Sequence, residues 1–197
     1  MTTEFHTQTV LAKGLRALLA RLEDHLDLSG PLNVYLAGGM ALHLYTANRY
    51  TTDVDAEFGV RIHIPSDLAV EVTFEDGTKD VVYFDTNYNS TFALMHEDYL
   101  DDSIPVDFGL KHICVRILSP VDLAVSKIAR LAENDKEDIA ALVRLGLTTS
   151  DAIEQRATSA LGGYVGNVNA LRLNVRDAVE IARGVEREVA SPISPHS

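Results

Sequence analysis

The sequence has one cysteine, no long apolar run and a shortage of positive charge, and each absence excludes a class of protein. Cys114 has no partner for an intrachain disulfide, and its apolar neighbours predict a small buried hydrophobic residue. Lysine and arginine number 17 against 29 aspartates and glutamates, which gives a formal net charge of −12. Sequence-blind binding of nucleic acid needs many cations against phosphates, so this charge argues against it.

The sequence also lacks the marks of a membrane or secreted protein. The longest apolar stretches, such as residues 33–44, are too short and too broken by glycine to cross a bilayer. No basic region followed by an apolar run stands at the N-terminus, so we expect no secretory signal and a cytoplasmic, reducing location. Hydrophobic residues make up 46% of the 197 residues and charged ones 23%, the balance of a globular domain with a real core.

Hydrophobic spacing predicts an α/β fold for the first two thirds of the chain. We expect a small mixed β-sheet of about four or five strands flanked by helices. The Asp-Gly turn at residues 75–78 predicts a hairpin. The expected strands are residues 33–37, 53–60, 71–74, 81–85, 104–109 and 113–118, and the expected helices are residues 8–26, 40–47 and 65–70.

The last third of the chain has helical spacing throughout. Ser119 followed by Pro120 is typical of a helix start, and this helix is expected to run to Leu131. Further helices are expected at residues 136–145, 150–161 and 167–185. We therefore divide the chain into an α/β core (1–118), a helical C-terminal part (119–190) that closes over one side of a cleft, and a disordered tail (191–197).

Two aspartates carry the chemistry that the sequence predicts. Asp53 and Asp55 stand at i and i+2 of an expected strand, which places both carboxylates on the same face. Two like charges that close repel each other unless a cation lies between them. Mg²⁺ (or Mn²⁺) takes oxygen ligands, and a pair of such ions can bridge the attacking and leaving oxygens of a nucleotidyl transfer.

A glycine pair precedes the aspartates by the length of a helix. Gly38 and Gly39 bring bare backbone close to a ligand, and the N-terminus of the following helix adds N–H groups and a partial positive charge. This arrangement suits a triphosphate. The glycine pair and the Asp-x-Asp are each weak evidence alone. Together, with the Arg-x-Thr lead-in at Arg49, they predict a metal site with a phosphate substrate.

Two stretches carry a family resemblance. LAGGMAL (residues 36–42) followed by RYTTDVD (49–55) resembles the signature of the DNA polymerase beta-like nucleotidyltransferase superfamily. The Arg-x-Thr-x-Asp-x-Asp form is similar to that of minimal bacterial members found as toxins in abortive-infection (type IV) toxin–antitoxin systems. SPVDLAVSK (119–127) with DKEDI (135–139) resembles the helical lysine and aspartate segment of those proteins. The resemblance covers residues 33–145.

The resemblance implies transfer of a nucleoside monophosphate from a nucleoside triphosphate, such as ATP, to an acceptor hydroxyl. Asp53 and Asp55 would ligate the metal ions, and a third carboxylate is expected on a neighbouring strand. We assign it to Asp107, which stands between two apolar residues, and which would ligate the catalytic metal and help to deprotonate the acceptor. Asp85, at the end of another apolar run, is the rival.

The remaining nucleotide-binding residues are assigned with their structural alternatives. Arg49 either contacts phosphate or forms a surface ion pair, and Thr51 and Thr52 suit a cap or turn, with Thr52 also counted at the nucleotide. Lys127 lies in an apolar helix, where it either extends its ammonium to solvent or, as the resemblance implies, reaches the triphosphate with help from Arg130.

Two acids follow Lys127 in the helical part. Asp135 is explained by capping of the helix that follows it. The resemblance implies that Asp138 lies near the nucleotide, where it would fix Lys127.

The acceptor and the physiological role stay open. A tRNA end, another RNA, a protein hydroxyl and a small molecule are all candidate acceptors, and a toxin would have an antitoxin protein as its partner. The alternative is a catalytically inactive nucleotidyltransferase fold that serves as an antitoxin or regulatory binding module. The intact glycine pair, Asp-x-Asp and Lys127 count against that alternative. Nucleotide binding with and without magnesium would separate the two.

Overall fold

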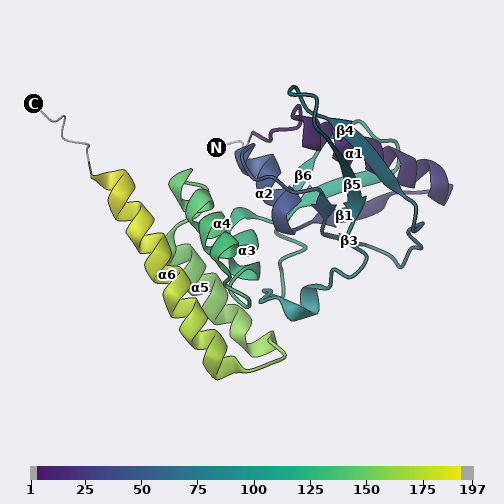
Figure 1. The fold of residues 1–197 in the computed structure, drawn as a ribbon. Helices are drawn as coiled ribbons and strands as arrows, with labels where there is room; N and C mark the ends of the chain where they lie inside the picture. The colour runs from purple at the N-terminus through teal and green to yellow at the C-terminus, as the bar shows by residue number, and fades with distance from the viewer. Residues whose placement is uncertain (1–3, 192–197) are drawn as a thin grey trace, which may run out of the picture. The chain divides into compact units, whose positions relative to one another are not determined.

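The computed structural model describes residues 4–191, which form two compact units (Figure 1). Unit 1 holds residues 4–89 and 99–119, and unit 2 holds residues 90–98 and 120–191. The α/β class with a helical C-terminal part is confirmed. The sequence did not reveal that residues 90–98 belong with the helices. Residues 192–197, most of the predicted disordered tail, lie outside the described residues.

The larger sheet of unit 1 has the strand order β3-β1-β7-β6. β1 is parallel to β7, whereas the β1–β3 and β6–β7 pairs are antiparallel. Leu36, at the end of β1, stands opposite Ala56 and Ile117. The strands are β1 (Leu32–Leu36), β3 (Ala56–Phe58), β6 (Ile104–Val106) and β7 (Ile113–Ile117).

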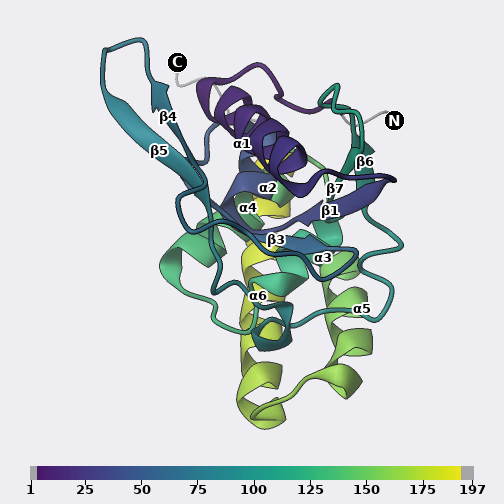
Figure 2. The same ribbon diagram turned by 90° about the vertical axis from the view of Figure 1, so that its right-hand side faces the viewer.

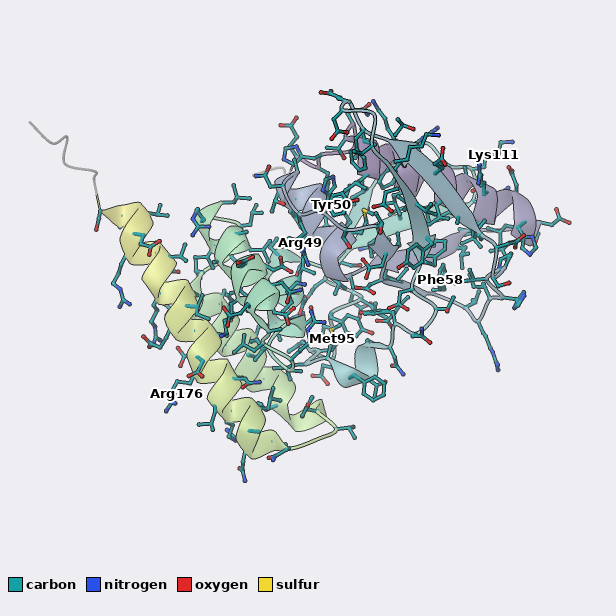
Figure 3. All side chains as sticks on the ribbon, viewed as in Figure 1. Arg49, Tyr50, Phe58, Met95, Lys111 and Arg176 are labelled. Carbon is teal, nitrogen blue, oxygen red and sulfur yellow. The ribbon has the colours of Figure 1, made fainter. Side chains whose placement is uncertain are left out.

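The smaller sheet of unit 1 has the order β2-β5-β4, with β2 parallel and β4 antiparallel to β5. The predicted hairpin is confirmed, and Gly77 in its turn has a φ of 83° that favours glycine. The rings of Phe58 (labelled in Figure 3) and Phe84 lie 5.7 Å apart and link the two sheets. The strands are β2 (Asp53–Val54), β4 (Ala69–Thr73) and β5 (Lys79–Phe84).

Three predictions for unit 1 are wrong. The expected strand at residues 53–60 is broken at Asp55, because β2 pairs in the smaller sheet and β3 in the larger one. The expected helix at residues 65–70 is replaced by a turn that leads into β4, where buried Val70 and Val72 alternate with exposed neighbours. Cys114 is exposed rather than buried, since it alternates with buried Ile113 and Val115 on β7.

Two helices of unit 1 support the sheets. α1 (Val10–Leu26) packs on β4 and β5, as Figure 2 shows, and a Cβ on Gly14 would come within 2.6 Å of Val72. Thr9 caps α1 by accepting a 3.1 Å hydrogen bond from the amide of Ala12. α2 (Gly38–Thr46) is buried from Met40 to Tyr45, so tertiary packing holds it on all sides.

Unit 2 is a helical assembly in which α6 packs on α4 and α5. Asp122 of α3 and Arg156 of α5 form a bidentate ion pair of 2.7 and 2.8 Å. None of the helices in residues 4–191 has the length and apolar character that crossing a membrane requires. The helices are α3 (Pro120–Ser126), α4 (Glu133–Arg144), α5 (Ser150–Ala160), α6 (Val168–Ala190) and the short 3₁₀ turns η1 (Ser90–Phe92) and η2 (Leu161–Gly163).

Candidate active site

The glycine pair and the second aspartate meet at the start of α2. Gly38 has a φ of 58°, and a Cβ added to it would lie 1.7 Å from Oδ2 of Asp55. Only glycine leaves room for that carboxylate, and only glycine takes the left-handed conformation without strain. The amide of Ala37 donates a 2.9 Å hydrogen bond to the carbonyl of Asp55, which fixes the break between β2 and β3 beside the turn.

The first aspartate is held by the threonine lead-in. The Thr51 hydroxyl donates a short hydrogen bond to Oδ1 of Asp53. Thr51 is itself buried, and a Cβ on Gly39 would lie 3.0 Å from its side chain. Thr51 therefore packs on the glycine turn and positions the Asp53 carboxylate. The sequence predicted a cap or turn for it, and only the tertiary contact with Gly39 reveals the second role.

The two rivals for the third carboxylate lie in different places. Asp85 follows β5, where its amide donates a 3.0 Å hydrogen bond to the carbonyl of Val54, so it lies next to Asp55 across the β2–β5 pair. Its Oδ1 accepts a 2.8 Å hydrogen bond from the amide of Asn87, which orients the side chain. Continuing the β2–β5 register, Asp85 comes opposite Asp55 and two residues beyond Tyr83, which stands opposite Asp53.

Asp107 lies at the far end of the larger sheet. Val106 pairs with Val115, so the next residue, Asp107, comes opposite Cys114, which in turn pairs with Asn33 of β1. The contact between Ala37 and Asp55 lies further along β1, at its other end. Four residues separate these levels, which is roughly 13 Å along a strand. The Asp107 carboxylate is exposed and accepts a 2.7 Å hydrogen bond from the amide of Gly109, a turn-forming contact.

A third acid on the same segment has two tyrosines near it. The Tyr99 hydroxyl donates toward both oxygens of Glu57, at 2.8 and 2.9 Å. Burial raises the pKa of Tyr88, and the charges of Glu57 and Asp55 raise it further, so this phenol stays protonated. The alternation of Asp53, Asp55 and Glu57 can be read from the sequence. Tyr88 and Tyr99 cannot be linked to it in that way, because the nearer one lies 31 residues after Glu57 (88 − 57).

The segment that leads to Asp53 is tied to α2. Nδ1 of buried His43 donates to the carbonyl of Arg49 over 2.7 Å, and its Nε2 lies 2.7 Å from the Thr9 hydroxyl. Burial lowers the pKa of His43, and the bond to Arg49 only partly offsets this. Arg49 and Tyr50, labelled in Figure 3, come just before β2, and Nη1 of Arg49 donates to the Tyr50 carbonyl over 3.2 Å.

The lysine motif forms a charge cluster within unit 2. Nζ of Lys127 lies 2.7 Å from Oδ2 of Asp138 and 3.8 Å from Oδ1 of Asp135, and all three side chains are buried. Arg130 binds Asp135 through two 2.7 Å hydrogen bonds. Asp135 also accepts from the amide of Ala132 at the start of α4.

Two opposing effects act on the Asp135 carboxyl. Burial would raise its pKa, but the hydrogen bonds from Arg130 and Ala132, together with the nearby charge of Lys127, outweigh burial and lower it. Binding of nucleotide by Lys127, Arg130 and Asp138 stays a prediction.

The donors at the glycine turn fit a hard divalent cation. Within residues 4–191, no group of three or more histidines, cysteines, aspartates and glutamates is close enough to hold a metal by itself. Mg²⁺ commonly binds one or two carboxylates and completes its shell with substrate phosphates. The Asp55 carboxylate seated on Gly38, with Asp53 on the preceding strand, offers such a partial set. The start of α2 beside it suits the phosphates.

Comparisons with known proteins identify the family of the chain. A family model described as "Nucleotidyltransferase of unknown function (DUF6036)" matches residues 13–176. No match was found among curated proteins. The crystal structure of an antigenic nucleotidyltransferase-like protein from Paracoccidioides brasiliensis matches 86% of this chain and 94% of its own length, at 17% sequence identity and a TM-score of 0.41. Since the family model covers well over half of the 197 residues, the chain belongs to this nucleotidyltransferase family.

Proposed function

We propose that the protein transfers a nucleoside monophosphate from a nucleoside triphosphate to an acceptor hydroxyl. The observation that carries the proposal is the Asp55 carboxylate seated against Gly38 at the start of α2. This contact brings a metal-ligating group next to backbone N–H groups that have no partner within the helix. Family membership supports the reaction class, and the donor set supports a divalent cation as its cofactor.

The residues of unit 1 divide the work of the proposed reaction. Asp53 and Asp55 would hold Mg²⁺, which supplies charge neutralisation for the reacting phosphate. Gly38 and Gly39 would let the terminal phosphates approach the start of α2. Thr51 would keep the Asp53 carboxylate in one orientation through its hydroxyl. Catalysis in such a site is mostly positioning and electrostatics.

We assign the third carboxylate to Asp85 in place of Asp107. Asp85 stands beside Asp55 across the β2–β5 pair, while Asp107 is four residues away along the larger sheet. In the transfer, the bond from the acceptor oxygen to the α-phosphorus forms and the bond to pyrophosphate breaks. The acceptor proton passes to a carboxylate of the site, and pyrophosphate leaves from the glycine turn.

The proposal is tested by labelling. Purified protein is incubated with each α-phosphate-labelled triphosphate, Mg²⁺ and total cell extract. We expect covalent label on one class of acceptor, with equimolar pyrophosphate, for wild-type protein only. Asp55→Ala is the matched inactive variant, and it should keep the fold because the Asp55 side chain is partly exposed. Equal labelling by wild type and Asp55→Ala would refute the assignment.

The resemblance to type IV toxins motivates a proposed physiological role. A toxin of this chemistry would modify an essential acceptor of its host, such as a tRNA end, and an antitoxin protein would restrain it. Expression of the wild-type chain alone should then slow growth, and Asp55→Ala should restore it. Unimpaired growth together with confirmed transfer in vitro would remove the toxin role but leave the enzyme.

A further inference from the structure

A second feature of unit 1 adjoins the carboxylates. A pocket of about 590 Å³ opens on the outer face of the β2-β5-β4 sheet. Its wall is formed by the segment before β4, including Ile64, Pro65 and Leu68, and its floor includes Val81 and Tyr83 of β5. This volume lies within the range of small-molecule sites, roughly 300–1,000 Å³.

Helix α1 covers one face of the β2-β5-β4 sheet, and the residues that form the floor of the pocket lie on the opposite, exposed face. Val82 and Phe84 point toward the core, and Val82 lies under Gly14 of α1. The alternating residues Val81 and Tyr83 are therefore turned outward, and they are 41% and 44% exposed. An aromatic ring and a valine side by side on an outer sheet face form a flat apolar platform.

This platform is continuous with the candidate metal site. Tyr83 stands directly opposite Asp53 in the parallel β2–β5 pair, on the same face. Asp85, which lines the pocket, is hydrogen-bonded through its amide to the carbonyl between Asp53 and Asp55. A molecule whose phosphate is bound at Asp53 and Asp55 would place the group attached to that phosphate in the pocket.

We propose that this pocket binds the nucleoside of the donor triphosphate, with the base stacked on Tyr83. The inference rests on the proposed function, because it concerns the nucleoside of the same triphosphate. The lining supplies uncharged hydrogen-bonding groups for a base edge, namely Ser66, Thr86 and Asn87. Every nucleobase has a π-face, so stacking on Tyr83 supplies affinity for the ring whichever base is present.

The charge of the lining favours a nucleoside over a nucleic-acid acceptor. None of the described residues that line the pocket is lysine or arginine, and Asp85 is its one acidic member. A strand with several phosphates needs cations along its path, and Asp85 would repel it. A single neutral base and sugar do not need such cations.

Binding measurements on the full chain test this assignment. Isothermal titration with Mg²⁺ present gives dissociation constants for a non-hydrolysable ATP analogue, for inorganic tripolyphosphate and for adenosine. The variants are Tyr83→Ala, Tyr83→Phe, and Val81→Asp, which places a charge on the platform. Phe92→Ala removes an aromatic ring that is 79% exposed and does not line this pocket, so it is the matched control.

We expect Tyr83→Ala to weaken the analogue about tenfold and Tyr83→Phe to keep its affinity within about threefold, because the ring carries the contact. Val81→Asp should weaken the analogue as well. Tripolyphosphate should bind all variants alike, since it has no base. In saturation-transfer NMR, adenosine should receive magnetisation on its base protons with wild type and lose it with Tyr83→Ala. Phe92→Ala should match wild type in every measurement.

Two outcomes would overturn the assignment. One is analogue and adenosine binding that Tyr83→Ala and Val81→Asp leave unchanged. The other is an unchanged analogue affinity with a raised KM for the acceptor, which would give the pocket to the acceptor. Failure of the proposed function looks different, because then neither the analogue nor tripolyphosphate would bind wild-type protein in a Mg²⁺-dependent way, while adenosine would still report on the pocket.

Discussion

The acids of unit 1 and the acids of unit 2 are held by different kinds of partner. In unit 2, Lys127 and Arg130 face Asp135 and Asp138, so two cations offset two carboxylates inside the cluster. In unit 1, Asp53 accepts from a threonine hydroxyl and Asp85 from a backbone amide. Neutral donors orient a carboxylate but leave its charge in place. The unit 2 cluster therefore contains its own cations, whereas the hydrogen bonds described here for Asp53 and Asp85 come from uncharged groups.

The largest expected effect comes from removing a metal ligand in unit 1. Asp55→Ala should lower nucleotidyl transfer at least about 1,000-fold, because the reacting phosphate would lose several kcal/mol of charge stabilisation. Its midpoint of thermal unfolding should stay within about 2 °C of wild type, as expected for a functional group. Steady-state labelling and differential scanning fluorimetry measure the two. A large drop in unfolding temperature would make Asp55 a structural residue and remove the contrast.

The next effect concerns the charge cluster of unit 2. Lys127→Met should lower the free energy of unfolding by about 3–5 kcal/mol, because buried Asp138 would lose its cation and Asp135 would keep only Arg130. Adding Asp138→Leu should recover much of this loss, since it removes one stranded charge. Urea unfolding followed by circular dichroism measures both variants. If Lys127→Met were as stable as wild type, the cluster would not contribute the stability assigned to it.

A paired substitution sharpens the assignment of the third carboxylate. Asp85→Asn should reduce kcat about 100-fold, or roughly 2.7 kcal/mol, because it removes a charge beside Asp55. Asp107→Asn should change kcat less than about twofold, since its register level is four residues distant. Steady-state kinetics on both proteins decide between them. The reverse pattern would restore Asp107 as the third carboxylate.

Alanine substitutions at Gly38 and Gly77, which both have a positive φ, distinguish backbone strain from a role in binding. Gly77→Ala should cost about 1–2 kcal/mol of stability, because its φ is 83° and no atom lies within 4 Å of the new Cβ. Gly38→Ala should cost at least as much and should also abolish Mg²⁺-dependent nucleotide binding, since its Cβ would occupy the place of the Asp55 carboxylate. Chemical unfolding and titration calorimetry report the two effects. Equal binding by both variants would contradict the turn's role.

The smallest expected effect is a pH dependence in unit 2. The pKa of Asp135 is lower in the folded state, so its contribution to stability is present above the unfolded value of about 3.9 and is lost as pH falls through the folded value. Asp135→Asn should therefore flatten the acid limb of the stability curve below about pH 4. Unfolding midpoints measured from pH 3 to pH 7 test this. An unchanged acid limb would assign it to other carboxylates.

Local sequence patterns predicted the structural elements that depend only on residues close together in the chain. The hairpin at Gly77 followed from an Asp-Gly turn between alternating strands, and α1 followed from its apolar spacing. The break at Asp55 could not be predicted, because it depends on a hydrogen bond from Ala37 and on two different partner strands. The sequence offered Asp107, between two apolar residues, and Asp85, at the end of an apolar run, as rivals. Only the register between strands separates them.

The same limit applies to the partners of individual side chains. Residue type and spacing drew attention to Asp53, Asp55 and Lys127. The contact of Thr51 with Gly39 and the pairing of Tyr99 with Glu57 come from segments that are distant along the chain. A lone sequence carries no signal for such pairings. The platform at Tyr83 could likewise not be predicted from the sequence, because its exposure depends on which face of the sheet α1 covers.

The most direct test of the central claim is calorimetric titration of a non-hydrolysable nucleoside triphosphate into the full chain, with and without Mg²⁺, alongside the Asp53→Asn and Asp55→Asn variants. We expect binding that needs Mg²⁺ in wild-type protein and that is weakened at least about tenfold in each variant, or about 1.4 kcal/mol. Binding that is equally tight without Mg²⁺, or unchanged in both variants, would contradict the claim that these carboxylates form a metal site for a triphosphate.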